Sequence, residues 1–291
     1  MVLTLPQRPA FCSYHNSSLI ISTYQLETSS TRAGTLYFLD PALLVKNSIE
    51  LPAGIFRFEC PKPDLCVSAL TDGSLAFTNL NDNTSTFTNV SEHMLLDLSL
   101  ESDHCLTSDN KGNIYLVDVN SGSVEKHANA HSLPYTSDCE IWTCSLGQDF
   151  ACSGGEDAVV RLWCPRTFSS LGVIKGFEAG VTFTKFVNDK TLLTGSYDHS
   201  IRLFDLRNFK TPIKEHKTAG GVWHIEQEHD GEKRWLASCM YGGWELLDSE
   251  LISIKTDIAA GSNLLYGVTF LPNNQLAYVT FNDYSVSLSS I

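Results

Sequence analysis

A short phrase made of a turn and an alternating apolar strand recurs along this chain. The residue before each copy lies at positions 33, 72, 111, 157, 198, 241 and 283, so the intervals are 39, 39, 46, 41, 43 and 42 residues. A period of this length, built from short strands, is typical of a β-propeller with four strands per blade. The seven copies cover residues 34–40, 73–79, 112–118, 158–164, 199–205, 242–248 and 284–290.

Two more apolar segments precede each copy, and helical periodicity is absent at any useful length. In the fifth repeat they are Val181–Thr184 and Thr191–Asp198. We therefore predict an all-β fold, a single seven-bladed propeller over residues 1–291. The blades are expected at about 10–40, 54–80, 91–120, 138–166, 179–208, 220–249 and 264–291.

The N-terminal segment is expected to complete the last blade. Residues 10–14 and 19–24 supply the inner two strands of the first blade, so Val2 to Leu5 have no place in that blade. We predict that residues 1–8 pair into the last blade and close the propeller, because an open propeller would expose two long strand edges.

Charge and composition limit the partners that we expect. The net charge is −13 and the pI is near 5.0, and basic residues such as Lys210, Lys214 and Lys217 are scattered. We therefore expect no nucleic acid as partner; a basic protein surface would fit better, although the acidity also serves simple solubility. No apolar run is long enough for a membrane helix and no secretory signal is visible, so we expect a cytoplasmic protein without membrane contact.

Nine cysteines and two spaced histidines raise the question of a metal. The cysteines form no C-x-x-C pattern, and several lie in apolar strands, where free thiols act as small hydrophobic groups. His127 and His131 are four residues apart, a spacing that could bind a metal on a helix. Asn129, Ser132 and Pro134 instead favour a loop over the polar stretch 121–137, and no carboxylate completes a ligand set nearby. We expect neither a metal nor another cofactor.

One repeat resembles the WD repeat. Thr194-Gly-Ser-Tyr-Asp198 is followed by Ile201-Arg-Leu-Phe-Asp205, with Phe204-Asp205 in the position of Trp-Asp. The predicted fold is accordingly a WD40-type propeller. The Gly-His dipeptide typical of WD repeats is absent throughout. We therefore do not expect the usual internal hydrogen-bonded tetrad in most blades.

A narrower resemblance spans nearly the whole chain. The blocks that carry it follow one order along the sequence, and Glu140-Ile-Trp142 and Gly220-Gly-Val-Trp223 are the most specific. Together they resemble the WD-repeat family of diphthine methyl ester hydrolases, also called diphthine methyltransferases. Members often have a histidine at the position that Ser137 occupies here. The remaining blocks are Thr23-Tyr-Gln-Leu26, Ser153-Gly-Gly-Glu-Asp157, Thr194-Gly-Ser-Tyr-Asp198, Asp205-Leu-Arg-Asn208, Ala237-Ser-Cys-Met240 and Leu265-Tyr-Gly267.

The resemblance implies an enzyme of diphthamide biosynthesis. Its substrate would be translation elongation factor 2 that carries methylated diphthine, a side chain with a methyl ester and a trimethylammonium group. Hydrolysis of the ester would yield diphthine, and we expect the enzyme to be a monomer. Two alternatives stay open, a non-catalytic WD-repeat scaffold and a reader of a methylated ammonium group. The usual hydrolase motifs, such as G-x-S-x-G and H-E-x-x-H, are absent.

Propeller geometry suggests where a site would lie. The innermost strand of a blade begins at the face where the second strand ends, so two sets of residues would converge there. Trp142, Trp223 and Tyr266 are candidates for an aromatic cage around the quaternary ammonium, and Glu140 for countercharge or general base. The second set comprises Gln25 and Asp198, both candidates for substrate binding, together with Asp157 and Tyr241.

Each candidate also has a structural interpretation. Asp157 and Asp198 could cap their own turns, and Trp142 and Trp223 could pack between blades. Gly220-Gly221 could permit a close turn.

Two further candidates could act in catalysis. His224 should point to the opposite face from Trp223. Cys239 could act as nucleophile only with a lowered pKa. We therefore favour a water activated by a carboxylate or histidine over a cysteine nucleophile.

Overall fold

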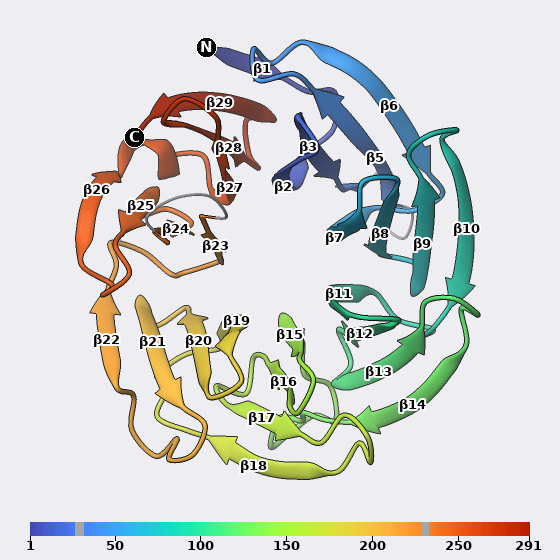
Figure 1. The fold of residues 1–291 in the computed structure, drawn as a ribbon, viewed down its shortest axis with the longest axis vertical. Coiled ribbons are helices and arrows are strands. Elements are labelled where there is room, and N and C mark those ends of the chain that lie inside the picture. The colour runs from blue at the N-terminus through green and yellow to red at the C-terminus, as the bar shows by residue number, and fades with distance from the viewer. Residues whose placement is uncertain (27–31, 229–232) are drawn as a thin grey trace. The chain divides into compact units, whose positions relative to one another are not determined.

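The computed structural model describes residues 1–26, 32–228 and 233–291. Their regular secondary structure comprises β-strands and one 3-10 turn, η1 (Ala259–Gly261), joined by turns and loops. The strands form seven antiparallel sheets, six of four strands and one of five (Figure 1). These sheets are the blades of a seven-bladed β-propeller, so the predicted fold class is confirmed. The chain divides into two compact units, residues 1–56 with 216–291 and residues 57–215.

The first unit holds three of the sheets. Its strands are β1 (Val2–Thr4), β2 (Pro9–His15), β3 (Ser18–Thr23), β4 (Gln25–Leu26), β5 (Arg32–Leu39), β6 (Val45–Leu51), the start of β7 (Ile55–Lys62), β23 (His224–Gln227), β24 (Trp235–Ser238), β25 (Trp244–Leu247), β26 (Ser253–Asp257), β27 (Leu265–Leu271), β28 (Gln275–Thr280) and β29 (Ser285–Ser290).

The second unit holds the other four sheets. Its strands are the rest of β7, β8 (Leu65–Leu70), β9 (Ser74–Asn79), β10 (Thr84–Asn89), β11 (Leu95–Glu101), β12 (His104–Asp109), β13 (Asn113–Asp118), β14 (Val124–Asn129), β15 (Thr143–Leu146), β16 (Ala151–Gly154), β17 (Val160–Trp163), β18 (Ser170–Ile174), β19 (Val181–Asn188), β20 (Thr191–Ser196), β21 (Ser200–Asp205) and most of β22 (Lys214–Lys217).

The N-terminal strand completes the last sheet, as predicted. β1 pairs antiparallel with β29, with Leu3 opposite Val286. The N–H of Leu5 then donates to the carbonyl of Tyr284 at 2.9 Å, and the Leu5 side chain is buried among residues of β2, β3, β28 and β29. The pairing therefore covers the edge of β29 and adds an apolar side chain to the core of the first unit.

Apolar layers between adjacent sheets form the core. In the second unit, Leu106 and Ile114 of one sheet pack against Cys144 and Trp163 of the next. In the first unit, Leu236 and Trp244 pack against Val268 and Leu276 in the same way. Because both faces of a sheet are covered, the inner three strands carry apolar residues on both sides, and this is the pattern that repeats along the sequence.

The outermost strands are polar, and the predicted blade ranges stop short of them. β10, β14 and β26 expose most of their residues, so they lack the apolar phrase of the inner strands. The stretch 121–137 illustrates the difference. We expected a loop throughout, but residues 124–129 form β14, which pairs with β13. The backbone hydrogen bonds of an edge strand need no apolar side chains.

His131 forms a tetrad of the kind that the missing Gly-His dipeptide had led us not to expect in most blades. Its Nδ1 lies 2.8 Å from Oδ1 of Asp157, and its Nε2 lies 2.8 Å from the hydroxyl of Ser153. The indole N–H of Trp163 donates to the same hydroxyl at 3.0 Å. The four side chains tie the segment before β15 to β16 and β17. An alanine, Ala130, precedes the histidine where the dipeptide would have glycine.

Candidate functional site

Five aromatic rings of the first unit form a closed loop of contacts, which we call the aromatic cluster. Trp223 stacks on Tyr266, with ring centroids 4.9 Å apart and planes inclined by 19°. Tyr266 contacts Phe281 at 4.9 Å, and Phe281 stacks with Tyr24 at 5.8 Å. Phe56 closes the loop edge-on, 6.0 Å from Tyr24 and 6.3 Å from Trp223. The structure thus brings together two of the three predicted cage residues, Trp223 and Tyr266.

Strand ends place these rings side by side. Phe56 and Tyr266 are the second residues of β7 and β27, and Trp223 directly precedes β23. Tyr24 and Phe281 directly follow β3 and β28. Antiparallel pairing brings the start of an innermost strand beside the end of the next strand, as Leu265 opposite Thr280 shows. Strand starts and strand ends therefore meet within the first unit, but the strand-end residues of the cluster are Tyr24 and Phe281, not the predicted Gln25 and Tyr241.

The rings of the cluster already attract cations of the chain itself. The guanidinium carbon of Arg8 lies 5.0 Å from the centroid of Phe281, and that of Arg32 lies 5.8 Å from the centroid of Tyr24. Burial, together with the nearby Tyr24 and Tyr241, raises the pKa of Tyr266 to about 12. The Tyr266 phenol therefore stays neutral near pH 7, so the rings of the cluster carry no charge of their own.

Gly220 holds the segment that carries Trp223 close to a neighbouring turn. A Cβ at this position would lie 2.3 Å from the carbonyl oxygen of Cys239 and 2.6 Å from the backbone nitrogen of Gly242. Two backbones can approach this closely only without a side chain between them. The close-turn interpretation of Gly220 is thus what the backbone geometry favours. The same contact sets where Trp223 enters the cluster, and Trp223 is only 5% exposed.

The other predicted first-unit residues lie near these strands but outside the cluster. Gln25 begins β4, and its Oε1 is buried without a hydrogen-bond partner among the described residues. His224 begins β23, and its ring contacts Phe11 edge-on at 4.8 Å. Cys239 is buried, and burial with the nearby Glu245 charge raises the pKa of its thiol to about 12. A buried thiol of this pKa is a poor nucleophile near neutral pH.

Glu140 and Trp142 lie together in the second unit. The indole N–H of Trp142 donates to Oε2 of the exposed Glu140 carboxylate at 2.8 Å. The indole ring meets Tyr197 edge-on at 5.0 Å and covers Gly180, where a Cβ would lie 2.2 Å from Cζ3 of Trp142. The ring thus packs against the next blade, as the structural interpretation of Trp142 has it, and its N–H also orients a carboxylate.

Asp198 is an internal ion-pair partner. Its side chain is 1% exposed, and Oδ2 accepts hydrogen bonds from Nη1 of Arg202 at 2.8 Å and from the N–H of Glu178 at 3.0 Å. Burial alone would raise the pKa of Asp198, but the hydrogen bonds from Glu178 and Arg202 outweigh it, so the pKa is lowered. The carboxylate thus holds its own blade together through Arg202 and Glu178, a structural role different from the turn cap that we had set beside substrate binding.

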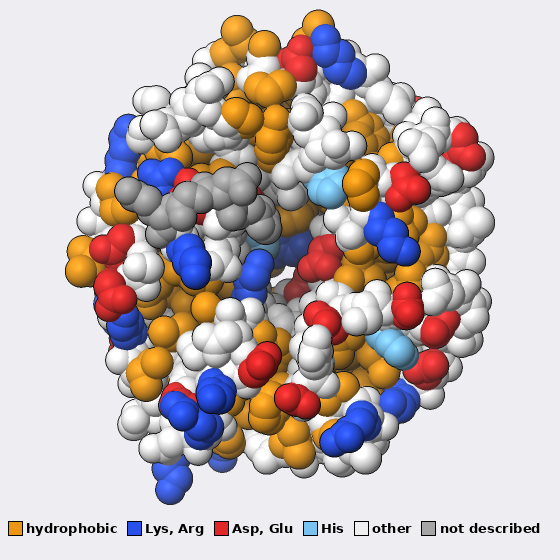
Figure 2. Space-filling model, viewed as in Figure 1, with side chains coloured by type: hydrophobic (Ala, Val, Ile, Leu, Met, Phe, Trp, Pro, Cys, Tyr) orange, Lys and Arg blue, Asp and Glu red, His pale blue; other side chains and the backbone are white. Residues whose placement is uncertain are grey.

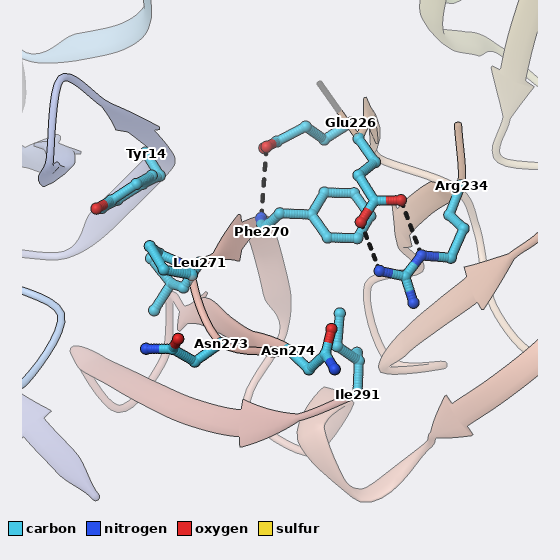
Figure 3. Close-up of a pocket in the computed structure, with 10 residues that line it drawn as sticks. Tyr14, Glu226, Arg234, Phe270, Leu271, Asn273, Asn274 and Ile291 are labelled. Atoms are coloured by element: carbon cyan, nitrogen blue, oxygen red, sulfur yellow. Dashed lines mark hydrogen bonds and ion pairs between the residues drawn. The ribbon is translucent and has the colours of Figure 1, made fainter. Parts of the chain in front are cut away.

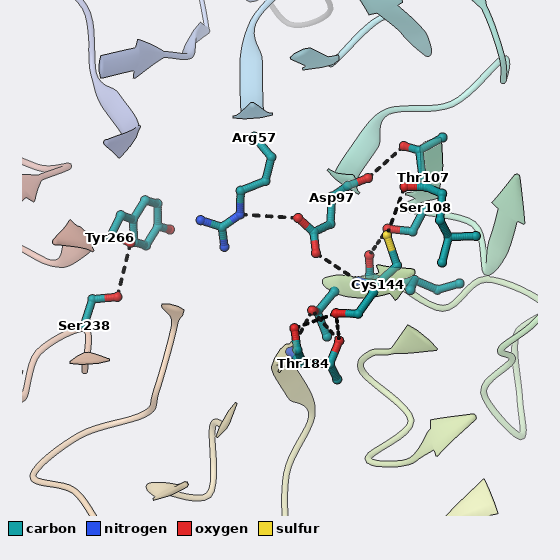
Figure 4. Close-up of polar contacts among 12 residues, drawn as sticks. Arg57, Asp97, Thr107, Ser108, Cys144, Thr184, Ser238 and Tyr266 are labelled. Carbon is teal, nitrogen blue, oxygen red and sulfur yellow. Dashed lines mark hydrogen bonds and ion pairs between the residues drawn. The ribbon is translucent and has the colours of Figure 1, made fainter. Parts of the chain in front are cut away.

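A second group of buried charges lies on β7 and β11 of the second unit. Nε of Arg57 is 3.6 Å from Oδ1 of Asp97, and the N–H of Cys144 donates to Oδ2 of Asp97 at 2.9 Å (Figure 4). Burial raises the pKa of Asp97 to about 6, although Arg57 and the Cys144 N–H lower it. Desolvation by the surrounding protein raises the pKa of Glu59 to about 7, with the Asp97 charge adding to the effect, although the residue keeps contact with solvent. Two carboxyl groups that titrate close to neutrality were not apparent from the sequence.

One pocket of the first unit was also not predicted from the sequence. It has a volume of about 320 Å³ and is lined by the turn after β27 together with Tyr14, Glu226 and Arg234 (Figure 3). Both Glu228 oxygens accept hydrogen bonds from Arg234, at 2.8 and 2.5 Å, and Oε1 of Glu226 accepts one from Thr269 at 2.9 Å. Its charged groups are thus used within the chain.

His127 and His131, the two histidines spaced four residues apart, have different partners. His127 stacks on Tyr115, whereas both ring nitrogens of His131 are bonded within the tetrad. The donor atoms of His131, Cys139 and Asp157 lie within 4.8 Å of one another. A metal there would have to displace the bonds to Asp157 or Ser153, so these residues fit a hydrogen-bonded tetrad better than a ligand set.

Charged side chains are intermixed on the face drawn in Figure 2, where basic groups occur in small sets among acidic and apolar ones. The net charge is −13. Among the described residues there is no helix long and apolar enough to traverse a bilayer. Seven of the nine cysteines are buried, in keeping with their expected role as small hydrophobic groups.

Comparison with known proteins gives a consistent picture. A family model described as WD domain, G-beta repeat matches residues 168–205. The diphthine methyltransferases of Mus musculus and Homo sapiens are each 29% identical, over 56% and 50% of this chain. A diphthine methyltransferase homolog of Dictyostelium discoideum is 26% identical over 53% of it. The matches span only 36%, 33% and 46% of the relatives' own lengths. The chain is therefore similar over about half of its length to these diphthine methyltransferases, and one of its repeats matches the WD-repeat model.

Proposed function

We propose that this chain acts in diphthamide biosynthesis by hydrolysing the methyl ester of methylated diphthine on translation elongation factor 2. The aromatic cluster is the observation that carries the proposal. Trp223 and Tyr266 come from two of the blocks on which the family resemblance rests, and they stack at 4.9 Å. The names of the relatives support the pathway.

The cluster suits the trimethylammonium group of the substrate. Such a group cannot donate hydrogen bonds, so its recognition relies on the electrostatic attraction of π faces and on apolar contact. Each aromatic face contributes about 0.5–2 kcal/mol to such binding. Tyr24, Phe56, Tyr266 and Phe281 all remain partly exposed, so each keeps some surface that the substrate could contact.

Glu140 is our candidate for the general base. Its carboxylate is exposed to water, and the hydrogen bond from Trp142 fixes its orientation. The carboxylate would take a proton from water as the water oxygen bonds to the ester carbonyl carbon. Collapse of the tetrahedral intermediate then breaks the bond to the methoxy oxygen. Methoxide takes up the proton from Glu140 and leaves as methanol, and the new carboxylic acid of diphthine releases its own proton to solvent and remains as a carboxylate.

A reader of methylated ammonium groups is the second candidate, because the aromatic cluster would serve recognition equally well without hydrolysis. One experiment separates the two. The pure protein is incubated with elongation factor 2 that carries methylated diphthine, and the modified peptide is weighed. Loss of one methylene mass from the ester supports the hydrolase, whereas binding without mass loss supports the reader.

Variants then test the assigned residues. We expect Glu140→Gln to lower turnover by about 10²–10⁴-fold with little change in substrate binding. Trp223→Ala should weaken substrate binding by about tenfold or more, since it removes a wall of the cluster. Tyr135→Ala is the control, because Tyr135 is 99% exposed and lies outside the cluster. Near-normal turnover of Glu140→Gln would remove the base assignment while leaving the cluster untouched.

A further inference from the structure

Two arginines hold the same position in neighbouring blades of the second unit. Arg161 lies on β17 four residues after Asp157, and Arg202 lies on β21 four residues after Asp198. Each is opposite a residue of the second strand, Ser153 for Arg161 and Thr194 for Arg202. The two side chains therefore start from equivalent places, and their partners can be compared directly.

Arg202 is fully engaged within its blade. Its Nη1 donates to Oδ2 of Asp198 at 2.8 Å, and its Nη2 lies 3.1 Å from Oε1 of Glu215 on the outermost strand, β22. Its guanidinium also lies 5.2 Å from the ring centroid of Phe177. Two carboxylates and one ring thus satisfy this guanidinium, and the Arg202 side chain is 7% exposed.

Arg161 lacks the second carboxylate. The residue opposite it on the outermost strand, β18, is Val173. Its contact with Asp157 is long, 3.9 Å from Nη2 to Oδ2, and the other oxygen of Asp157 is bonded to His131. Nε of Arg161 is buried and has no hydrogen-bond partner among the described residues. The guanidinium therefore has few acceptors within the chain, and its partly exposed end can donate to an external acceptor.

The open guanidinium lines a pocket of about 480 Å³. A second cation, Lys175, lies on its wall, and Leu133, Val159 and Val173 supply apolar surface. Glu156 and Asp157 also line the pocket; among the described residues neither cation forms an ion pair with Glu156, and Asp157 makes only the long contact with Arg161. The pocket therefore combines a planar fork of donors, a point charge and apolar walls within a protein of net charge −13.

We propose that this pocket binds a carboxylate side chain from an acidic segment of a partner protein. The bound carboxylate would occupy the place beside Arg161 that Glu215 holds beside Arg202, and it would accept a hydrogen bond from Nη2 of Arg161. Guanidinium and carboxylate pair through two parallel hydrogen bonds, which a planar fork favours over a single charge. Lys175 adds attraction at the rim, and the apolar wall selects an acidic residue with apolar neighbours. This site is separate from the aromatic cluster and does not depend on the proposed ester hydrolysis.

The Nε–H resonances of the arginine side chains test the proposal by NMR. Three probes are titrated into the labelled protein: acetyl-Leu-Glu-Leu-amide, its glutamine analogue and its phosphoserine analogue. We expect the glutamate peptide to shift the Arg161 resonance saturably and to leave that of Arg202 unchanged. The glutamine peptide should have at least about tenfold less effect. Equal shifts with glutamate and glutamine, or binding of the phosphoserine peptide alone, would overturn the carboxylate assignment.

Three variants complete the test. Val173→Glu supplies an internal carboxylate where blade five has Glu215, so it should abolish peptide binding and raise the melting temperature. Arg161→Lys keeps the charge but loses the fork, and should weaken binding by about tenfold. Arg166→Lys, an exposed arginine outside the pocket, is the matched control and should change binding less than about twofold. Unchanged peptide binding in Val173→Glu contradicts the proposal even if Arg161→Lys fails to fold.

Discussion

Asp97→Asn is the substitution that tests the buried charges of the second unit most directly. Burial raises the pKa of Asp97 from its ordinary 3.8 to about 6, against the opposing effects of Arg57 and the Cys144 N–H. Each unit of pKa shift corresponds to about 1.4 kcal/mol between the two protonation states. The shift therefore corresponds to about 2–3 kcal/mol, and solvent screening is modest because the side chain is only 14% exposed.

The sign follows from linkage. A carboxyl group with a raised folded-state pKa favours the fold while it is protonated, below the unfolded pKa near 3.8. This contribution is lost as pH rises through the folded pKa of about 6. Asparagine resembles the protonated form at every pH. We therefore expect the variant to match the native protein near pH 3.5 and to be more stable by about 2–3 kcal/mol at pH 8.

The assay is urea denaturation of both proteins at half-unit steps of pH, and the measured quantity is the difference in their free energies of unfolding. Asp149→Asn removes an exposed carboxylate and controls for the change in net charge. The reasoning fails if Asp97→Asn is destabilising at pH 8. It fails equally if the difference between variant and native protein does not change between pH 4 and pH 7.

Three further predictions concern the fold. Deleting residues 1–8 removes β1 and Leu5, so the melting temperature should fall sharply in a thermal scan; an unchanged value would disprove the closure of the last blade by β1. His131→Phe breaks two hydrogen bonds and leaves buried polar groups without partners at Asp157 and Ser153. It should lower the free energy of unfolding, measured by denaturant titration, by about 1–3 kcal/mol per group, and a neutral result would contradict the tetrad. Gly220→Ala places a Cβ 2.3 Å from a carbonyl oxygen, so it should lower the melting temperature and shift the tryptophan fluorescence. Unaltered spectra would refute the role of Gly220 in positioning Trp223.

The inner strands of each blade are readable from sequence, and the outer strands are not. An inner strand packs on both faces, so its apolar phrase is required in every copy. β10 and β14 contact solvent over much of their length, and many polar sequences would pair equally well there. His131 was recognised only as part of a polar stretch, because its partners Asp157 and Ser153 lie 26 and 22 residues away.

The sequence blocks that resemble the family identify some residues of the aromatic cluster and miss others. Trp223 and Tyr266 were found because they lie in blocks that resemble the family. Phe56 occupies the equivalent strand position without such a block, and it was missed. Tyr24 and Phe281 occupy the same position after β3 and β28, so an alignment of strand ends would have found both. The buried pairing of Arg57 with Asp97 depends on how neighbouring inner strands lie, which no local pattern specifies.

The most direct test of the proposed function is the mass of the methylated diphthine peptide after incubation of elongation factor 2 with the native chain, Trp223→Ala and Glu140→Gln. The account predicts loss of one methylene mass and release of methanol with the native protein. It further predicts weakened substrate binding for Trp223→Ala and loss of turnover for Glu140→Gln. An unchanged peptide mass with native protein that binds the substrate would contradict the hydrolase and leave a reader of methylated ammonium groups in its place.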